Sequence, residues 1–362
     1  MPPDHRRPWA PGRGELYDIV LRLRAADGTI LDEATTYAGL RAVAIDGRRN
    51  LINGKPVFQR LVLDQGYYPD GILTAPSEQA LVRDIELSMD AGFNGVRLHQ
   101  KVFEERFLYH CDRLGYLAWG EFGDWFSNLQ TDGEPLRSHH AAAYDSTYIT
   151  QWLEVLERDV SHPAIIGWCP LNETRQGRRD AITRLDDCTR GLFLATKAMD
   201  PARPVLDTSG YTHRLNESDV CDSHDAPQDP ARFAEHHAGL AHGAPYVNSR
   251  ASIASVPYAG QPYFVSEFGG TRWNPHAAPD KDGWGYGQTP ETIEEFYARF
   301  ENLCAVLLDN KDMFGYCYVQ LTDVFQEQNG IYTFDRQPKF DLARIRRAQS
   351  RPAAYERPTT DA

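Results

Sequence analysis

The stretch GWCPLNETRQ, from Gly167 to Gln176, starts as a run of small and apolar residues and ends on an amide and a carboxylate, Asn172 and Glu173. Such an apolar run is typical of a strand that is buried on both faces in a parallel sheet. A strand of this kind exposes a side chain only where it ends. The pattern therefore predicts that Asn172 and Glu173 lie at the carboxyl end of a buried strand, on the floor of a binding site.

Short apolar stretches like this one alternate with amphipathic helical patterns along most of the chain. The predicted strands are residues 57–63, 95–99, 116–121, 164–173, 204–209, 219–224, 262–267 and 314–320. Helical patterns occupy residues 76–93, 102–115, 146–160, 182–199 and 291–310, whereas the link 225–261 shows little helical period. Eight strands that alternate with helices predict an α/β fold, a closed (β/α)₈ barrel.

Polar or ionisable side chains occupy the ends of five predicted strands. They are His99, Glu121, Asn172, Glu173, His224 and Glu267. In a barrel the carboxyl ends of all the strands point toward one face, so residues that are distant in the sequence converge there. We therefore expect these side chains to form one site.

Two glutamates on different strands suggest a specific chemistry. Cleavage of a glycosidic bond requires one carboxyl group to protonate the leaving oxygen and another to attack or assist at the anomeric carbon. If configuration is retained, the two carboxyl groups should lie about 5 to 5.5 Å apart. We expect Trp168 to desolvate Glu173 so that it holds a proton, and Tyr211 or His224 to keep Glu267 ionised.

Other side chains near the strand ends have a binding interpretation and a structural alternative. The amide of Asn172 is suited to a sugar 2-hydroxyl. Tyr211 and Trp273 fall just beyond strand ends, where an aromatic face can stack on a pyranose ring, although core packing is the commoner role of such residues. His99 and His224 raise the possibility of a metal, but no His-x-x-x-His pair accompanies them. We therefore predict neither a metal nor a cofactor.

Composition excludes several classes of protein. The 362 residues carry a formal net charge of −13, which disfavours nucleic acid and anionic membranes as partners. No apolar run reaches 18 residues, so no spanning helix is expected, and no apolar stretch follows the basic start, which favours the cytoplasm. The six cysteines are widely scattered and predict reduced, buried thiols.

The chain ends differ in texture from the middle. Residues 8–45 contain two alternating runs around an Asp-Gly turn, which predicts a β-hairpin. Residues 46–348 contain the predicted barrel, and residues 349–362 have the composition of a disordered tail. The sequence therefore predicts a hairpin, one large barrel and a tail.

Four separated motifs resemble the catalytic domain of glycoside hydrolase family 2, which contains β-galactosidases, β-glucuronidases and β-mannosidases. They are LINGKPVFQRLVLDQGYYPDGI, GWCPLNE, YFVSEFGG and YVQLTDVFQEQNGIYTFDRQPKF, in that order, and the resemblance spans residues 8–340. It implies that Glu173 is the general acid/base and Glu267 the nucleophile of a retaining exo-β-glycosidase. It also implies that Asn172, His99, Gln320 and Asp323 line the carbohydrate site.

The resemblance also implies what precedes the barrel in family members, a jelly-roll domain and an immunoglobulin-like domain. Residues 8–45 look like the last strands of the latter, so missing N-terminal domains or a homo-oligomer are expected. Glucuronidases of the family carry an Asn-x-Lys motif, and the nearest stretch, Asn274-Pro275-His276, lacks the lysine. A neutral hexose such as galactose is therefore the expected substrate. The alternatives are a catalytically weak carbohydrate-binding fragment and an endo-β-glycanase of a related barrel family.

Overall fold

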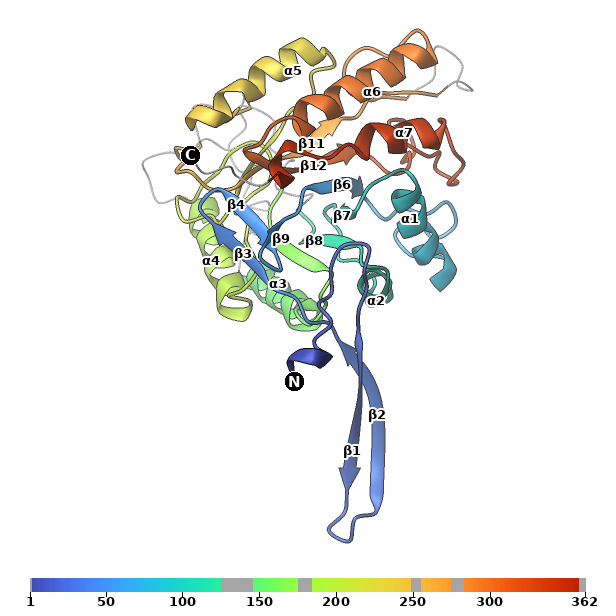
Figure 1. Cartoon of the computed structure of the whole chain (residues 1–362), viewed down its shortest axis with the longest axis vertical. Coiled ribbons are helices and arrows are strands. Elements are labelled where there is room, and N and C mark those ends of the chain that lie inside the picture. Colours follow the sequence, from blue (N-terminus) through green and yellow to red (C-terminus); the bar gives the residue numbers. More distant parts are fainter. Residues whose placement is uncertain (1, 125–145, 175–183, 249–254, 275–282, 358–362) are drawn as a thin grey trace.

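A curled parallel sheet lies at the centre of the computed structural model, which describes residues 2–124, 146–174, 184–248, 255–274 and 283–357. Its strands are β6 (Gln59–Asp64), β7 (Gly95–Leu98), β8 (Leu117–Glu121), β9 (Ile165–Cys169), β10 (Cys221–His224), β11 (Tyr263–Gly269) and β12 (Met313–Val319). They pair in the order β10, β11, β12, β6, β7, β8, β9 (Figure 1). All six pairings are parallel, so each connection must cross back outside the sheet.

The extended segment 204–209 fills the remaining position between β9 and β10. Parallel bridges join Val205 to Trp168 and Ser209 to Asn172, and the amide of Leu206 donates to the carbonyl of Trp168 at 2.9 Å. On the other side, the amide of Asp219, just ahead of β10, donates to the carbonyl of Val205 at 3.1 Å. The predicted α/β barrel is therefore confirmed, with this segment in the place of the expected strand.

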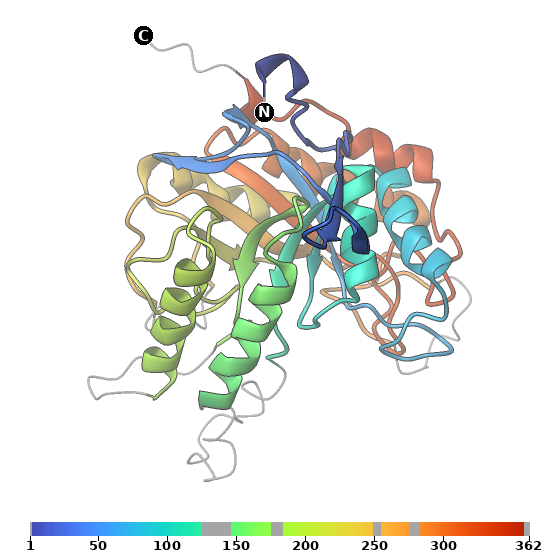
Figure 2. The same cartoon turned by 90° about the horizontal axis from the view of Figure 1, so that it is seen from below.

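Helices surround the sheet on its outer side (Figures 1 and 2). They are α1 (Glu78–Asp90), α2 (Glu105–Leu114), α3 (Ser146–Asp159), α4 (Arg184–Met199), α5 (Pro230–His237), α6 (Ile293–Leu308) and α7 (Leu342–Gln349). Local sequence defines their ends: the Ser77 side chain caps α1, and Gly115 ends α2 in the left-handed conformation with φ of 69°.

Two of these helices, α5 and α7, were not predicted. The link after β10 contains α5 and a 3₁₀ turn, Ala238–His242, although it shows little helical period. With eight residues, α5 is too short for periodicity to reveal, but Asp229 accepts from the Ala231 amide as an N-cap and Pro230 occupies the first turn. Capping signals therefore carry the information that the hydrophobic period lacks.

Aromatic rings fill the barrel interior. The Trp119 ring stacks on Phe264 with centroids 5.3 Å apart, and its Nε1 donates to Gln59 at 2.8 Å. Glycine is required opposite it, because a Cβ at Gly167 would lie 2.6 Å from the Trp119 ring. Trp168 differs from the expectation: it donates to Asp200 at 2.8 Å and packs edge-on against the ring of Trp152 in α3. It therefore lies between the barrel and its helices and is not positioned to desolvate Glu173.

A small antiparallel sheet and the C-terminal segment pack together. The sheet consists of β3 (Val43–Asp46), β4 (Arg49–Ile52) and β5 (Lys55–Pro56), so the expected domain boundary after residue 45 falls within β3. A 3₁₀ turn, Ala354–Glu356, follows α7, and the hydroxyl of its buried Tyr355 donates to the carbonyl of Asn50 at 2.8 Å. Residues 349–357 are thus packed on the barrel, unlike the disordered tail that their composition predicts.

The N-terminal hairpin projects away from the barrel (Figure 1). A 3₁₀ turn, Pro3–His5, precedes its two antiparallel strands, β1 (Tyr17–Arg24) and β2 (Ile30–Ala38). Leu21, Leu23 and Leu31 on these strands are 57%, 62% and 62% exposed. The predicted hairpin is present, and it leaves apolar side chains in contact with solvent.

Two expectations from composition concern the whole chain. All six cysteines are free thiols and five of them are buried. Among the described residues, no helix is both long enough and apolar enough to cross a membrane.

Candidate active site

Arg97 on β7 is the centre of a buried polar cluster at the carboxyl ends of the strands. Its Nη1 donates to Glu267 Oε1 at 2.9 Å, its Nη2 donates to Asn172 Oδ1 at 2.6 Å, and its Nε donates to Glu121. Burial would raise the pKa of Glu121, but the charge of Arg97, the contact with His99 and the hydrogen bond from the Gln100 amide together hold that pKa below its ordinary value. One cation therefore joins the ends of β8, β9 and β11.

Glu267 lies near the end of β11 and is almost fully enclosed. Arg97 contacts its Oε1, and Nε2 of His224 lies 3.4 Å from the same oxygen. Nδ1 of His99 is 3.9 Å from it. One oxygen of Glu267 thus lies within 4 Å of a guanidinium and two imidazoles.

Glu173 is presented by an unusual backbone. Its φ of 51° is left-handed, a conformation that costs a non-glycine residue about 1 to 3 kcal/mol and must be held by its surroundings. The amide of Glu173 donates to the carbonyl of Ser209 at 2.7 Å, so the segment 204–209 supplies that support. The Glu173 side chain is 18% exposed against 7% for Glu267. Glu173 is therefore the more accessible of the two carboxyl groups.

His224, the last residue of β10, lies between the two glutamates. Its Nδ1 is 2.9 Å from Glu173 Oε1, and its Nε2 is 2.9 Å from the hydroxyl of Ser209. Burial opposes charge on the ring, but the carboxylates of Glu267 and Glu173 outweigh burial and raise the pKa of His224 above its ordinary value. The two carboxyl groups therefore stabilise the charged form of His224 relative to the neutral ring.

A second buried network surrounds Nε2 of His224. The Ser209 hydroxyl lies 2.9 Å from this nitrogen and donates to Asp222 at 2.9 Å, and Nη1 of Arg97 lies 3.3 Å from the same nitrogen. Burial alone would raise the pKa of Asp222, but hydrogen bonds from His213 and Ser266 lower it to about 2. Asp222 is therefore a fixed acceptor, and Nδ1 is the His224 nitrogen that faces Glu173.

The separation of the two glutamates is the main geometric result. One oxygen of Glu173, one of Glu267 and a nitrogen of His224 all lie within 4.8 Å of one another. Retaining glycosidases hold their carboxyl groups about 5 to 5.5 Å apart, whereas inverting enzymes need about 6.5 to 9.5 Å. The same three groups could approach a divalent cation, but Arg97 already places positive charge against Glu267 and so opposes a metal there.

Three other predicted site residues lie in or beside this cluster. The side-chain oxygen of Asn172 accepts from Arg97, and the backbone N–H of Asn172 donates to Asp124 at 2.8 Å. Nδ1 of His99 is 3.6 Å from Glu121, which also accepts from the amide of Gln100 at 2.9 Å. The ring of Tyr211 meets the ring of His224 edge-on, with centroids 5.8 Å apart.

The other three predicted site residues have different surroundings. Gln320, just after β12, donates to Asn329 at 2.9 Å. Asp323 pairs with Lys339 at 2.7 Å, a buried ion pair within the segment that follows β12. The amide of Trp273 donates to the carbonyl of Gln328 at 3.0 Å. No hydrogen bond or ion pair among the described residues joins Asp323 or Trp273 to either glutamate.

Sequence reasoning missed Arg97, although a signal was present. A lone cation within the apolar strand GVRLH must find buried carboxylates as partners, and Glu121 and Glu267 were already candidates. Ser209, Asp222 and Ser266 were missed because they act through one another. Their roles depend on pairing between strands, which no local pattern reports.

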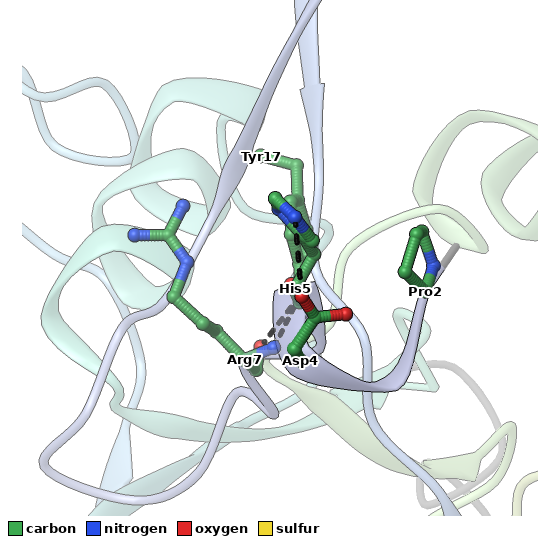
Figure 3. Close-up of a pocket in the computed structure, with 5 residues that line it drawn as sticks. All are labelled: Pro2, Asp4, His5, Arg7 and Tyr17. Atoms are coloured by element: carbon green, nitrogen blue, oxygen red, sulfur yellow. Dashed lines mark hydrogen bonds and ion pairs between the residues drawn. The ribbon is translucent and has the colours of Figure 1, made fainter.

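A pocket of about 450 Å³ lies elsewhere, at the N-terminus (Figure 3). It is lined by Pro2, Asp4, His5, Arg7 and Tyr17. The Tyr17 hydroxyl donates to the carbonyl of His5 at 2.9 Å, so the pocket lies between the first turn and the hairpin. It contains none of the residues of the glutamate cluster.

An α/β barrel with two glutamates and an arginine at its strand ends defines a class of glycosidase scaffolds. The sequence profile of "Glycosyl hydrolases family 2, TIM barrel domain" matches residues 43–251, more than half of the chain. The chain therefore belongs to glycoside hydrolase family 2. Glu173 and His224 fall inside the matched range, and Glu267 lies beyond it.

Curated proteins that are similar in sequence include β-galactosidases. A β-galactosidase of Photobacterium profundum is 26% identical over 215 residues, which cover 59% of this chain and 19% of that protein. A β-galactosidase of Vibrio vulnificus is 28% identical over 199 residues, 54% of this chain and 18% of the relative. The matched region is thus about a fifth of the length of these relatives.

Solved structures share the fold over nearly the whole chain. A β-D-glucuronidase of Dictyoglomus thermophilum aligns with a TM-score of 0.75 and 19% identity over 97% of this chain and 60% of that one. A family 2 β-galacturonidase of Eisenbergiella tayi, bound to galacturonate, aligns with a TM-score of 0.71 and 18% identity over 98% and 61%. At this identity the likeness concerns the fold.

Proposed function

We propose that this chain is a retaining exo-β-glycosidase that releases terminal neutral hexoses, β-galactosidase-like, by double displacement. The observation that carries the proposal is the approach of Glu173 and Glu267, whose oxygens lie within 4.8 Å of each other beside His224. Family membership supports a glycosidase, and the short separation supports retention of configuration.

In the proposed first step, Glu267 is the nucleophile. Its carboxylate oxygen bonds to the anomeric carbon while the bond from that carbon to the aglycone oxygen breaks, and Glu173 gives its proton to the departing oxygen. Arg97 and His224 contact Oε1 of Glu267 and so orient its carboxyl group for attack. The greater exposure of Glu173 suits a group that must reach the aglycone.

In the proposed second step, Glu173 acts as a base. It removes a proton from a water molecule, whose oxygen bonds to the anomeric carbon as the ester to Glu267 breaks. His224 assists at both stages, because one proton between Nδ1 and Glu173 Oε1 is held on either the imidazole or the carboxyl group. Glu173 can thus lose and regain a proton without a large change of local charge.

The proposed neutral sugar has support from both relatives and charge. The curated relatives are named β-galactosidases, although the solved structures are named glucuronidases and galacturonidases. A uronate needs a cation to bind it, yet two cations that the structure describes at the ends of β7 and beyond β12, Arg97 and Lys339, are already paired with Glu267 and Asp323. Part of the stretch Asn274-Pro275-His276 lies outside the described residues.

A trapping experiment tests the proposal. The protein is incubated separately with dinitrophenyl 2-deoxy-2-fluoro β-galactoside, β-glucoside and β-mannoside, and its intact mass and peptides are then measured. An activated leaving group needs no acid, so a retaining enzyme accumulates the glycosyl ester. We expect an adduct on Glu267 and none on a Glu267→Ala variant. An adduct on another residue would overturn the assignment, and none from folded protein would favour a binding fragment without turnover.

The fragment alternative has one specific observation in its favour. This chain covers about 60% of the length of the structural neighbours, and β1 and β2 expose leucines that a larger sandwich would cover. We propose that this hairpin corresponds to the last strands of an immunoglobulin-like domain. The trapping experiment separates a complete catalyst from a barrel that binds sugar without cleaving it.

A further inference from the structure

Four side chains form a closed hydrogen-bonded ring where β12 and β6 end. Gln65 Nε2 donates to Gln320 at 2.9 Å and to Glu327 Oε2 at 3.0 Å. Gln320 donates to Asn329 at 2.9 Å, and Asn329 donates to Glu327 Oε1 at 3.2 Å. Three of these residues come from the segment after β12, and Gln65 follows β6. The ring holds the Glu327 carboxylate in one orientation.

The backbone of Glu327 is fixed as firmly as its side chain. Its amide donates to the carbonyl of Val324 at 2.9 Å, and the Val324 amide donates back at 3.0 Å. A parallel bridge joins Glu327 to Trp284, in the segment that follows β11. Glu327 is half-buried, and these contacts prevent its carboxylate from turning toward solvent. Binding residues are typically held in this way by the hydrogen bonds around them.

No ion pair joins Glu327 to a cation among the described residues. Each of its oxygens accepts one neutral amide hydrogen, which leaves lone pairs for further donors. Burial raises the pKa of Glu327, the amide donors and the charge of His99 oppose this, and the charge of Glu267 adds to it. Structural carboxylates in this chain are paired differently: Asp323 has Lys339, and Glu121 has Arg97.

Glu327 belongs to the same face as the catalytic pair. Gln65 and Gln320 directly follow β6 and β12, the strands between β7, which carries Arg97, and β11, which carries Glu267. Strand order therefore places the ring that holds Glu327 on the face of the barrel that carries Glu173 and Glu267.

We propose that Glu327 is a substrate-binding residue that accepts hydrogen bonds from hydroxyl groups of the terminal sugar and repels sugars that carry a carboxylate. This inference rests on the proposed function and specifies its substrate class as neutral glycosides. Hydrogen bonds to a charged acceptor are roughly twice as strong as neutral ones, and two oxygens can accept from two adjacent hydroxyls. A uronate in the same place would put two anions together.

The test combines a residue change with substrate changes. The variants are Glu327→Gln and wild type, and the substrates are 4-nitrophenyl β-galactoside, its 3-, 4- and 6-deoxy analogues and 4-nitrophenyl β-galacturonide. We expect Glu327→Gln to lower kcat/KM for the galactoside about 10- to 100-fold. The deoxy analogue that lacks the bound hydroxyl should be cleaved equally by both proteins, within about twofold. The galactoside-to-galacturonide preference should fall at least tenfold.

A matched control separates recognition from folding. Glu356 is also half-buried and accepts from the amide of Phe58 at 3.0 Å, but it belongs to the C-terminal 3₁₀ turn. Glu356→Gln should leave all substrate preferences unchanged. Thermal melting of both variants shows whether the protein is folded under assay conditions. The inference is overturned if Glu327→Gln changes no preference, if no deoxy analogue shows coupling, or if wild type prefers the galacturonide.

A binding measurement keeps this inference distinct from the proposed function. Methyl 1-thio-β-galactoside resists cleavage, and its affinity for wild type and for Glu327→Gln can be measured by calorimetry even if no turnover occurs. Weaker binding to the variant, by about tenfold or more, would support the role of Glu327 in a chain without catalysis. If both proteins bind the thiogalactoside equally and the fluorosugar labels Glu267, the role of Glu327 is contradicted, whereas the proposed glycosidase activity is supported.

Discussion

At the scale of single residues, the two glutamates differ in their burial and in the side chains that contact them. Glu267 is enclosed and ion-paired with Arg97, whereas Glu173 is more exposed and lies 2.9 Å from Nδ1 of His224. In the mechanism that we propose, the same residue type is the nucleophile in one place and the general acid/base in the other. The difference arises from contacts with residues that are distant in the sequence, Arg97 for Glu267 and His224 for Glu173.

We predict that Glu173→Ala slows cleavage selectively. Substrates with poor leaving groups, such as methyl glycosides, should be cleaved about 10² to 10⁴ times more slowly, because they need the proton that Glu173 supplies. Dinitrophenyl glycosides depart without that proton, so their glycosylation step should change little. Pre-steady-state kinetics with both substrate types measures this. Equal losses in the glycosylation step for both would contradict the acid role of Glu173.

We predict that His224 contributes stability at low pH and loses it as the pH rises. Its pKa is raised in the folded state, so its stabilising contribution is complete below its ordinary pKa of about 6.5 and disappears through the higher folded value. The facing charges are Glu173, Glu267 and Arg97, of which Arg97 opposes the effect. Urea unfolding of wild type and His224→Gln from pH 5.5 upward should give curves that converge.

The control for this pH series is His242→Gln, which removes an exposed histidine from a 3₁₀ turn. A stability difference between wild type and His224→Gln that grows with pH would have the wrong sign. It would show that the imidazole, not the imidazolium, is the form bound between the glutamates.

At the scale of elements, periodicity predicted the strands and the long helices, because both types of element must bury one set of side chains. It failed for α5, which is short and is specified by its cap. It also predicted segment 204–209 as a strand, whereas isolated bridges hold it. The local hydrophobic pattern indicates which residues are buried. Regular strand pairing also depends on the neighbouring strands, which this pattern does not specify.

We predict that the hairpin promotes self-association. Leu21, Leu23 and Leu31 are exposed on an unpaired two-stranded ribbon, and such edges pair with other chains. Changing all three to Thr should cost at most about 0.5 kcal/mol of unfolding free energy per site, because little burial is lost. Sedimentation should show concentration-dependent association of wild type that the triple variant lacks.

A leucine elsewhere provides the comparison for the hairpin variant. Leu194 in α4 is 56% exposed, so Leu194→Thr removes a similar apolar surface from a helix. It should leave sedimentation unchanged. A monomeric wild type at all concentrations would contradict the prediction for the hairpin.

At the scale of the whole molecule, the site is assembled from strand ends spread between β6 and β12. The rule that strand ends converge predicted Glu173, Glu267, Asn172 and His224, because chain order alone places them on one face. It could not predict Glu327, whose position depends on a bridge to the segment after β11. Contacts between two loops depend on tertiary packing, and they produce no hydrophobic periodicity in the sequence of either loop.

We predict that Arg97 supports the molecule as a whole as well as the site. Arg97→Met leaves Glu121 and Glu267 buried without their cation, which typically costs 3 to 5 kcal/mol. Urea unfolding should show this loss of free energy. Arg83→Met, which removes an exposed arginine 3.9 Å from Glu86, should cost less than about 1 kcal/mol. Similar small losses for both variants would show that the buried pairs contribute little.

The segment 204–209 closes the barrel with isolated bridges, and its Ser209 contacts both Glu173 and His224. Isolated bridges join this segment to its neighbours less extensively than regular strand pairing would, so we expect the barrel to open most readily here. Each such opening withdraws the carbonyl that keeps Glu173 in its strained turn. If the chain cleaves glycosides as we propose, heat should therefore reduce its activity before it unfolds the chain.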